Sequence, residues 1–251
     1  MSDVAVHLWT ASDGVELAFH ETGQGPPVIL LHGLFSDANM NWIKFGHAER
    51  IAAVGFRVIM PDLRAHGLSG KPHGAEHFSK GILARDLREL IAHLELAEFD
   101  LGGFSLGART TVEGVGQGLR PRRALLGGAG LEGLRNWKRR KTFFLEAIGL
   151  FDHVQRGDPH WLSIQFMKSQ HVDRVAAGLL LESFEDTSME WLQAFTMPTL
   201  VVCGSEDEDN GSAEELAAAL PNAEFSQVSG THMSSVTKPE LGEAIAMFLE
   251  S

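Results

Sequence analysis

The chain contains one cysteine, Cys203, in 251 residues. A single cysteine excludes an intramolecular disulfide and any metal site built from a cysteine cluster. It ends an apolar run at residues 199–203, where we interpret it as a small buried hydrophobic residue. No run of about 18 apolar residues exists, so no segment is predicted to span a membrane. Residues 1–7 show no charged segment followed by an apolar one, so we expect no secretory signal and a cytoplasmic location.

Positive charge is also scarce. Lysine and arginine number 21 against 33 aspartates and glutamates, which gives a formal net charge of −12. Binding nucleic acid or an anionic lipid surface requires a basic face, so neither partner is expected. The exception is a short basic run at residues 135–141, which we interpret as a solvated helix face rather than an anion site. Composition leaves the oligomeric state open.

Short apolar runs alternate along the chain with segments of helical period, and this rhythm predicts an α/β fold with a mostly parallel sheet flanked by helices. Eight runs are predicted as strands, at residues 4–9, 15–20, 28–31, 56–60, 99–103, 123–127, 199–203 and 224–228. The first two are joined by a predicted hairpin turn at residues 12–14. Helices are predicted at about 40–53, 80–95, 106–118, 212–220 and 239–250.

The alternation of predicted strands and helices stops between residues 131 and 196. This stretch has helical patterns, no β-like run, and three of the five tryptophans, Trp137, Trp161 and Trp191. We therefore expect residues 1–130 and 197–251 to form one core. Residues 131–196 are predicted to form a helical lid, or cap, inserted between the sixth and seventh strands. The alternative is a second small domain packed elsewhere.

A Gly-Phe-Ser-Leu-Gly sequence occupies residues 103–107, between a predicted strand and a predicted helix. In this context a tight turn exposes the Ser105 hydroxyl above the sheet, and glycines are needed because flanking side chains would collide with backbone. Ser105 is therefore the candidate nucleophile. The N–H of Leu106, at the start of the helix, is a candidate donor to an oxyanion. The alternative interpretation is a glycine-rich turn that needs close packing.

A serine nucleophile requires a base, and His232 is the best candidate because it follows the last predicted strand. Four other histidines lie in predicted strands or helices and are interpreted as surface or packing residues: His7, His20, His47 and His93. Three more cluster in one loop but lack a carboxylate partner and a fixed spacing, so no metal site is expected there: His66, His73 and His77.

The base in turn needs a carboxylate to orient it. Four consecutive acids, at residues 206–209, follow the predicted strand 199–203. We choose Asp207 from this run, with Asp209 as the next candidate and Glu132 as a distant third. The remaining acids are interpreted as a solvated loop.

Taken together, these residues resemble the α/β-hydrolase superfamily, and its small-lid bacterial esterase-type members in particular. The markers span the chain: His32-Gly33, residues 61–69, the sequence at 103–107, Gly204-x-x-Asp207 and Gly230-Thr-His232-Met. Their order of serine, acid and histidine is the order of that family. The resemblance implies that Leu34, which follows His-Gly, supplies a second oxyanion N–H. It also implies a lid between the sixth and seventh strands, which matches residues 131–196. Residues 62–69 are interpreted as a structural loop.

The predicted activity is that of a serine hydrolase cleaving carboxylic esters of small or hydrophobic substrates through an acyl-enzyme on Ser105. No metal or organic cofactor is implied, and the expected partner is a small-molecule substrate. Phe35 and Phe104 are predicted to contact a hydrophobic acyl group, although the lid aromatics equally suit a lid core. Haloalkane dehalogenase and epoxide hydrolase activities are disfavoured, because those relatives use an aspartate where Ser105 stands.

Three alternatives stay open. A serine-dependent C–C bond hydrolase of ring-cleavage products uses the same three groups. A cofactor-free perhydrolase side activity is compatible with them as well. A non-catalytic ligand-binding α/β-hydrolase is the alternative from another class, and it is disfavoured because Ser, Asp and His are all present.

Overall fold

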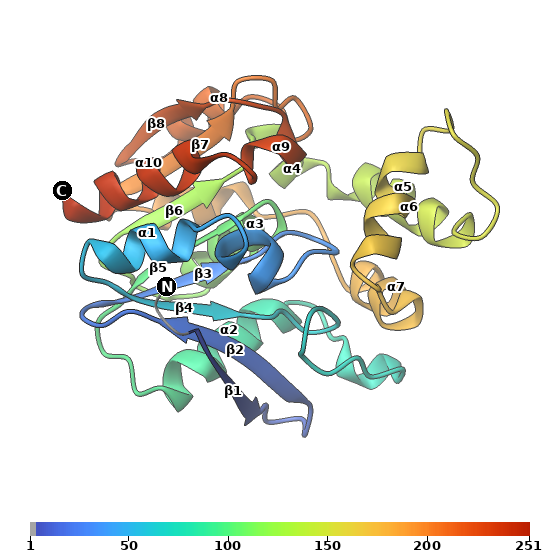
Figure 1. The fold of residues 1–251 in the computed structure, drawn as a ribbon, viewed down its shortest axis with the longest axis horizontal. Coiled ribbons are helices and arrows are strands. Elements are labelled where there is room, and N and C mark those ends of the chain that lie inside the picture. Colours follow the sequence, from blue (N-terminus) through green and yellow to red (C-terminus); the bar gives the residue numbers. More distant parts are fainter. Residues whose placement is uncertain (1–3) are drawn as a thin grey trace.

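The computed structural model describes residues 4–251, so the first three residues of the predicted core lie outside it. Eight strands form one sheet in the order β1-β2-β4-β3-β5-β6-β7-β8 (Figure 1). β1 and β2 pair antiparallel, β2 pairs antiparallel with β4, and the remaining neighbours are parallel. The strands are β1 (Ala5–Thr10), β2 (Glu16–Thr22), β3 (Pro27–Leu31), β4 (Arg57–Pro61), β5 (Asp100–Phe104), β6 (Ala124–Gly127), β7 (Thr199–Gly204) and β8 (Ala223–Val228). The predicted fold class is confirmed, and every predicted strand bound lies within two residues of the observed one.

The central strands are apolar because both of their faces are covered. Every residue of β5, β6 and β7 is buried, whereas the edge strand β1 buries only Trp9. Successive residues of β3 face opposite sides, so Val28 and Leu30 join one hydrophobic cluster while Ile29 and Leu31 join the other. The sheet therefore separates two cores.

Helices cover each core. α1 (His47–Ala53) and α10 (Pro239–Glu250) pack on the face of Val28 and Leu30. α2 (Ile82–His93), α3 (Leu106–Gly116) and α8 (Ala213–Ala219) pack on the other face. A short 3-10 helix, η2 (Ala75–His77), and a four-residue helix, α9 (His232–Ser235), lie in the connections.

One predicted helix is divided in two. The expected helix at 40–53 is a π-helical turn, η1 (Asn39–Ile43), followed by α1. Gly46 separates them with φ +77°, a left-handed conformation that a continuous right-handed helix excludes. The prediction of a single helix was wrong because apolar periodicity continues across a glycine that the backbone uses as a break.

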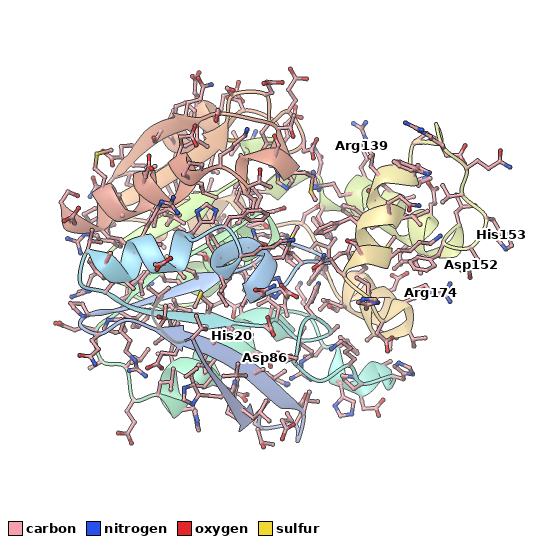
Figure 2. All side chains as sticks on the ribbon, viewed as in Figure 1. His20, Asp86, Arg139, Asp152, His153 and Arg174 are labelled. Atoms are coloured by element: carbon pink, nitrogen blue, oxygen red, sulfur yellow. The ribbon has the colours of Figure 1, made fainter. Side chains whose placement is uncertain are left out.

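Residues 131–196 are helical and lie between β6 and β7 in the chain. They form α4 (Leu131–Arg135), α5 (Trp137–Gly149), α6 (Trp161–Ser169), α7 (Arg174–Glu182) and the 3-10 helix η3 (Met189–Ala194). Figure 1 shows α5, α6 and α7 grouped to one side of the sheet. Figure 2 places Asp152, His153 and Arg174 at the outer end of this group. No helix in the described part of the chain combines the length and the apolar composition needed to cross a bilayer.

Candidate active site

Ser105 occupies a strained turn between β5 and α3. Its backbone has φ +53° and ψ −107°, a region that costs a non-glycine residue about 1–3 kcal/mol. A Cβ added to Gly107 would lie 2.2 Å from the carbonyl oxygen of Leu31, and one added to Gly103 would lie 2.5 Å from backbone of Gly107. Both glycines are therefore required by backbone packing. The N–H of Ser105 donates to the carbonyl of Gly127 at 2.8 Å, which ties the turn to β6.

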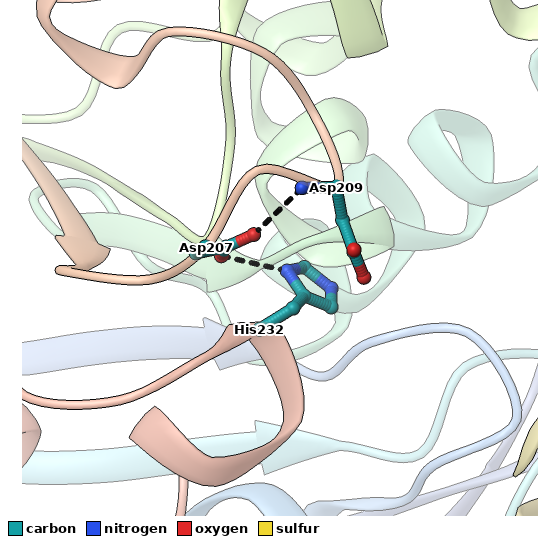
Figure 3. A group of neighbouring side chains, drawn as sticks. All are labelled: Asp207, Asp209 and His232. Carbon is teal, nitrogen blue, oxygen red and sulfur yellow. Dashed lines mark hydrogen bonds and ion pairs between the residues drawn. The ribbon is translucent and has the colours of Figure 1, made fainter.

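The fold brings Ser105, His232 and Asp207 into one line of hydrogen bonds. The His232 Nε2 lies 3.0 Å from the Ser105 Oγ, and its Nδ1 lies 2.8 Å from the Asp207 Oδ2 (the imidazole and Asp207 are drawn in Figure 3). With the carboxylate accepting from Nδ1–H, Nε2 is left to accept the serine proton. His232 is the first residue of α9. The N-cap Thr231 forms a reciprocal capping box with Ser234, which fixes the backbone position from which the imidazole extends.

Asp207, rather than Asp209, contacts the imidazole. The Asp207 side chain is 1% exposed, whereas Asp209 is exposed and donates its backbone N–H to the Asp207 Oδ1 at 3.2 Å. Burial alone would raise the pKa of Asp207, but hydrogen bonds from His232, Cys203 and the Asp209 N–H hold that pKa below its ordinary value. The carboxylate is therefore ionised at neutral pH. The third candidate, Glu132, is exposed on α4.

Two residues beside the hydrogen bonds of Ser105, His232 and Asp207 were not predicted from the sequence. The Cys203 thiol lies 3.4 Å from the Asp207 Oδ2, and burial raises its pKa to about 12, so it stays a protonated donor. The interpretation of Cys203 as a buried apolar residue is therefore incomplete. The Asn210 amide donates to the Gly128 carbonyl at 2.8 Å and lies 3.5 Å from the His232 Nδ1. Neither contact has a local sequence signal, since each depends on how the loop after β7 folds.

Leu106 directly follows Ser105, and a Cβ added to Gly33, the residue before Leu34, would lie 3.6 Å from the Ser105 Cβ. Leu106 is the first residue of α3, so its N–H has no acceptor within the helix. In the loop after β3, the N–H groups of Gly33, Phe35 and Ser36 all have acceptors inside the protein. Within residues 4–251, the Leu34 N–H makes no hydrogen bond. The Leu34 N–H is therefore a candidate donor to a bound ligand.

Two buried histidines hold the loop in place. His66 accepts the Phe35 N–H at its Nε2 and pairs its Nδ1 with the Arg64 carbonyl; His32 accepts the Leu63 N–H at its Nε2. Burial lowers the pKa of both histidines, that of His66 to about 3. Both rings are therefore neutral at physiological pH, as their acceptor role requires.

The remainder of the segment 62–69 is also occupied with internal contacts. The Arg64 guanidinium is fully buried and pairs with Asp86 at 2.8 Å and Asp13 at 2.7 Å; Figure 2 labels Asp86 in the body of the molecule. Asp62 accepts the N–H groups of Ala38 and Leu68. These contacts agree with the interpretation of residues 62–69 as a structural loop.

The two predicted acyl-contacting phenylalanines are both nearly buried. Phe35 is 2% exposed and meets the Phe144 ring edge-on, with 5.4 Å between ring centres. Phe104 is 4% exposed and packs with its ring centre 5.0 Å from that of His232. Phe104 therefore supports the imidazole, and contact of either ring with substrate stays a prediction.

The three clustered histidines of the loop after β4 have separate surroundings. His66 lies under the loop that carries Leu34, His73 contacts Asp173 of the insertion at 2.9 Å, and His77 lies beside Asp13. Among the described residues, one group of three side chains lies close enough to share a metal ion: Asp207, Asp209 and His232, with ligand atoms within 4.8 Å (Figure 3). The His232–Asp207 hydrogen bond already engages two of those atoms, so the group is part of the site described above.

Comparisons with known proteins find the same fold. A family model described as alpha/beta hydrolase fold matches residues 26–113. Non-heme chloroperoxidase CPO-A1 from Kitasatospora aureofaciens is 26% identical over 89% of this chain and 90% of its own. An epoxide hydrolase from Caballeronia sordidicola is 35% identical over 39% of this chain and 29% of its own. The match spans less than a third of the length of this epoxide hydrolase and of six other curated relatives.

Solved structures resemble the whole chain. A thermophilic esterase from Thermogutta terrifontis has a TM-score of 0.75 at 26% identity, covering 99% of this chain and 98% of that one. A bromoperoxidase from Bacillus anthracis has a TM-score of 0.77 at 21% identity, covering 98% of this chain and 100% of that one. Together with the family model and the eight-stranded sheet, these likenesses show that the chain has the α/β-hydrolase fold, and they support a place in that superfamily.

Proposed function

We propose that this protein is a serine hydrolase that cleaves carboxylic esters through an acyl-enzyme on Ser105. The observation that carries the proposal is the continuous line of hydrogen bonds from Ser105 through His232 to Asp207. A serine hydroxyl with an imidazole in hydrogen-bond contact, itself oriented by a buried carboxylate, is the arrangement that makes the hydroxyl a nucleophile at neutral pH.

In the first half of the reaction, the Ser105 Oγ attacks the ester carbonyl carbon and gives its proton to the His232 Nε2. The oxygen that becomes negative accepts hydrogen bonds from the N–H groups of Leu34 and Leu106; losing one such donor typically costs about 10²–10³ in kcat. The tetrahedral intermediate collapses, the bond to the alcohol oxygen breaks, and the alcohol leaves with the proton from Nε2. The acyl group remains on Ser105.

In the second half, water takes the place of the alcohol. It gives a proton to the His232 Nε2 as its oxygen attacks the acyl carbon, and collapse returns that proton to Ser105 with release of the carboxylic acid. Asp207 stays ionised throughout and stabilises the imidazolium formed in each half. Every proton is taken and returned by His232, so the chemistry needs no cofactor.

We propose that residues 131–196 act as a lid over this site. α5 contacts both loops that flank the serine: Phe144 meets Phe35 beside Leu34, and Arg140 donates to the carbonyl of Asp209 two residues after Asp207. Covering a site in this way excludes water and selects the substrate.

Ester cleavage is favoured over epoxide hydrolysis among the activities of similar proteins. The likeness to the Thermogutta esterase extends over nearly the whole of both chains. The epoxide hydrolase match covers only part of each protein, and a serine stands at the nucleophile position of this chain. A C–C bond hydrolase with the same three groups is separated from an esterase by the substrates it turns over.

The test is labelling with a fluorophosphonate, which reacts covalently with an activated serine. We expect the wild-type protein to be labelled, Ser105→Ala to be unlabelled, and His232→Ala to react more than about 10³-fold more slowly. Ser79→Ala, which changes an exposed serine, is the matched control. Absence of labelling in correctly folded wild type refutes the proposal. Turnover of p-nitrophenyl esters, but not of a vinylogous diketone, then identifies an esterase rather than a C–C hydrolase.

A further inference from the structure

One face of α5 contacts the two loops that flank the proposed catalytic serine. Trp137, Arg140 and Phe144 are spaced by three and four residues, so they share that face. Trp137 packs against α3, the helix that begins beside Ser105. The Arg140 Nη1 donates to the backbone carbonyl of Asp209 at 2.6 Å, and Phe144 contacts the loop that carries Leu34. The face therefore extends from the loop of Asp207 and Asp209 to the loop of Leu34 and Phe35.

Arg140 is the cation on this face, and most of its hydrogen-bonding capacity is unused. Its guanidinium lies 5.8 Å from the centre of the Phe144 ring. Its Nε is buried without a hydrogen-bond partner, and within residues 4–251 no carboxylate oxygen lies within 4.0 Å of it. Burial lowers the pKa of Arg140, opposed by the charges of Asp209 and Asp207, and an arginine remains protonated at neutral pH.

The cationic residues on either side of Arg140 in the sequence have different surroundings. Arg139 is exposed, and Figure 2 places it at the outer surface of the insertion. Lys141 pairs with Glu182 at 3.5 Å. The interpretation of residues 135–141 as a solvated basic face fits Arg139 but is wrong for Arg140, because the sequence run does not show that α5 turns Arg140 toward the acid loop.

We propose that Arg140 binds a carboxylate on the acyl part of the substrate, remote from the scissile ester. The preferred substrates are then monoesters of short dicarboxylic acids. With Nη1 engaged by the Asp209 carbonyl and Nε buried, Nη2 is the guanidinium nitrogen left to donate a charged hydrogen bond to a carboxylate. This inference rests on the proposed ester hydrolysis and adds the substrate class.

The surroundings of Arg140 suit such an acyl group. The partly exposed Phe144 ring, which packs on Phe35, provides an apolar surface between Arg140 and the loop of Leu34, against which a short methylene chain can lie. The Asp209 side chain lies beside the imidazole of His232 in Figure 3, and it would repel a carboxylate there. The substrate carboxylate is therefore directed to the far edge of the guanidinium.

The experiment compares two pairs of p-nitrophenyl esters, each an anion with a neutral ester of the same shape. The succinate monoester is paired with the 4-methylpentanoate, and the glutarate monoester with the 5-methylhexanoate. For each pair, kcat/KM of the anionic ester is divided by that of the neutral one, so that any general loss of activity cancels. The ratio is measured for wild type, Arg140→Gln, Arg140→Lys and the control Arg139→Gln.

We expect Arg140→Gln to lower the ratio by about 10- to 100-fold for one chain length, mainly through KM of the anionic ester, as for a lost charged hydrogen bond. Arg140→Lys should retain part of the ratio, and Arg139→Gln should leave it unchanged. An unchanged ratio in Arg140→Gln overturns the inference. This includes the result in which both esters are hydrolysed more slowly by the same factor, which would mean that Arg140 only holds α5 on the acid loop. If wild type hydrolyses none of the four esters, the proposed function fails instead.

Discussion

The neutral state of His66 makes the loop of Leu34 sensitive to acid. The His66 ring is 3% exposed, and its Nε2 accepts the N–H of Phe35, which follows Leu34 directly. Burial holds the pKa of His66 at about 3, against 6.5 for the exposed side chain. Below pH 6.5 the unfolded chain binds a proton that the native protein does not bind. The free energy of unfolding therefore falls as the pH is lowered from 6.5 toward 3.

The size of this effect follows from the two pKa values. Each pH unit between them lowers the free energy of unfolding by about 1.4 kcal/mol, so the loss between pH 6.5 and pH 4 is about 3 kcal/mol. That is a large share of the roughly 5–15 kcal/mol that holds a typical domain folded. In the folded protein, His66 takes up a proton only near pH 3, and that protonation would also remove the acceptor of the Phe35 N–H.

The assay is urea denaturation at pH 7.5 and pH 4.0 for wild type and His66→Gln. Glutamine keeps an uncharged acceptor and donor but does not titrate. The difference in free energy of unfolding between the two pH values should be larger for wild type by about 3 kcal/mol. His153→Gln, an exposed histidine of the insertion, should behave as wild type does. His32, whose ring contacts His66, is present in all variants. Equal pH dependence of wild type and His66→Gln would refute the reasoning.

Two further pairs of substitutions test the site. Gly107→Ala should destabilise the protein by roughly 1–3 kcal/mol in thermal or urea unfolding, because its Cβ would meet the Leu31 carbonyl; Gly149→Ala, with open space around it, should not. Tolerance of alanine at Gly107 would contradict the packing argument. Asp207→Asn should lower kcat by about 10²–10⁴-fold, while Asp209→Asn should change it little, because the hydrogen bond to the imidazole is made by Asp207 and the Asp209 carboxylate only lies near it. A larger loss in Asp209→Asn would reverse the choice of acid.

The sheet was predictable from the sequence because its central strands are buried on both faces. A strand covered on both sides is nearly continuously apolar. Runs such as residues 28–31 and 199–203 therefore indicate strands even when no homologous sequence is compared. The turn at Ser105 was predictable for a related reason, since only glycine fits at residues 103 and 107. Gly46 shows the limit of this approach, because a single left-handed residue divided a segment whose apolar pattern was continuous.

The surroundings of the candidate site were less predictable, because they depend on contacts between distant segments. Asp207 and Asp209 occupy the same acidic run, and only the fold of the loop buries one and exposes the other. Arg140 meets Asp209 across 69 residues, and Asn210 meets Gly128 across 82. No local pattern marks such pairs, since either partner alone resembles an ordinary surface residue.

Gly107 links the two proposed oxyanion donors physically. It follows Leu106, and it presses against the carbonyl of Leu31 at the end of β3, three residues before Leu34. The contact between α3 and β3 therefore sets the separation of the two N–H groups. A Cβ at Gly107 must move either α3 or the end of β3, and both movements displace one donor from the other. Because hydrogen bonds to a developing charge depend steeply on distance, Gly107→Ala should lower kcat in the fraction of protein that still folds.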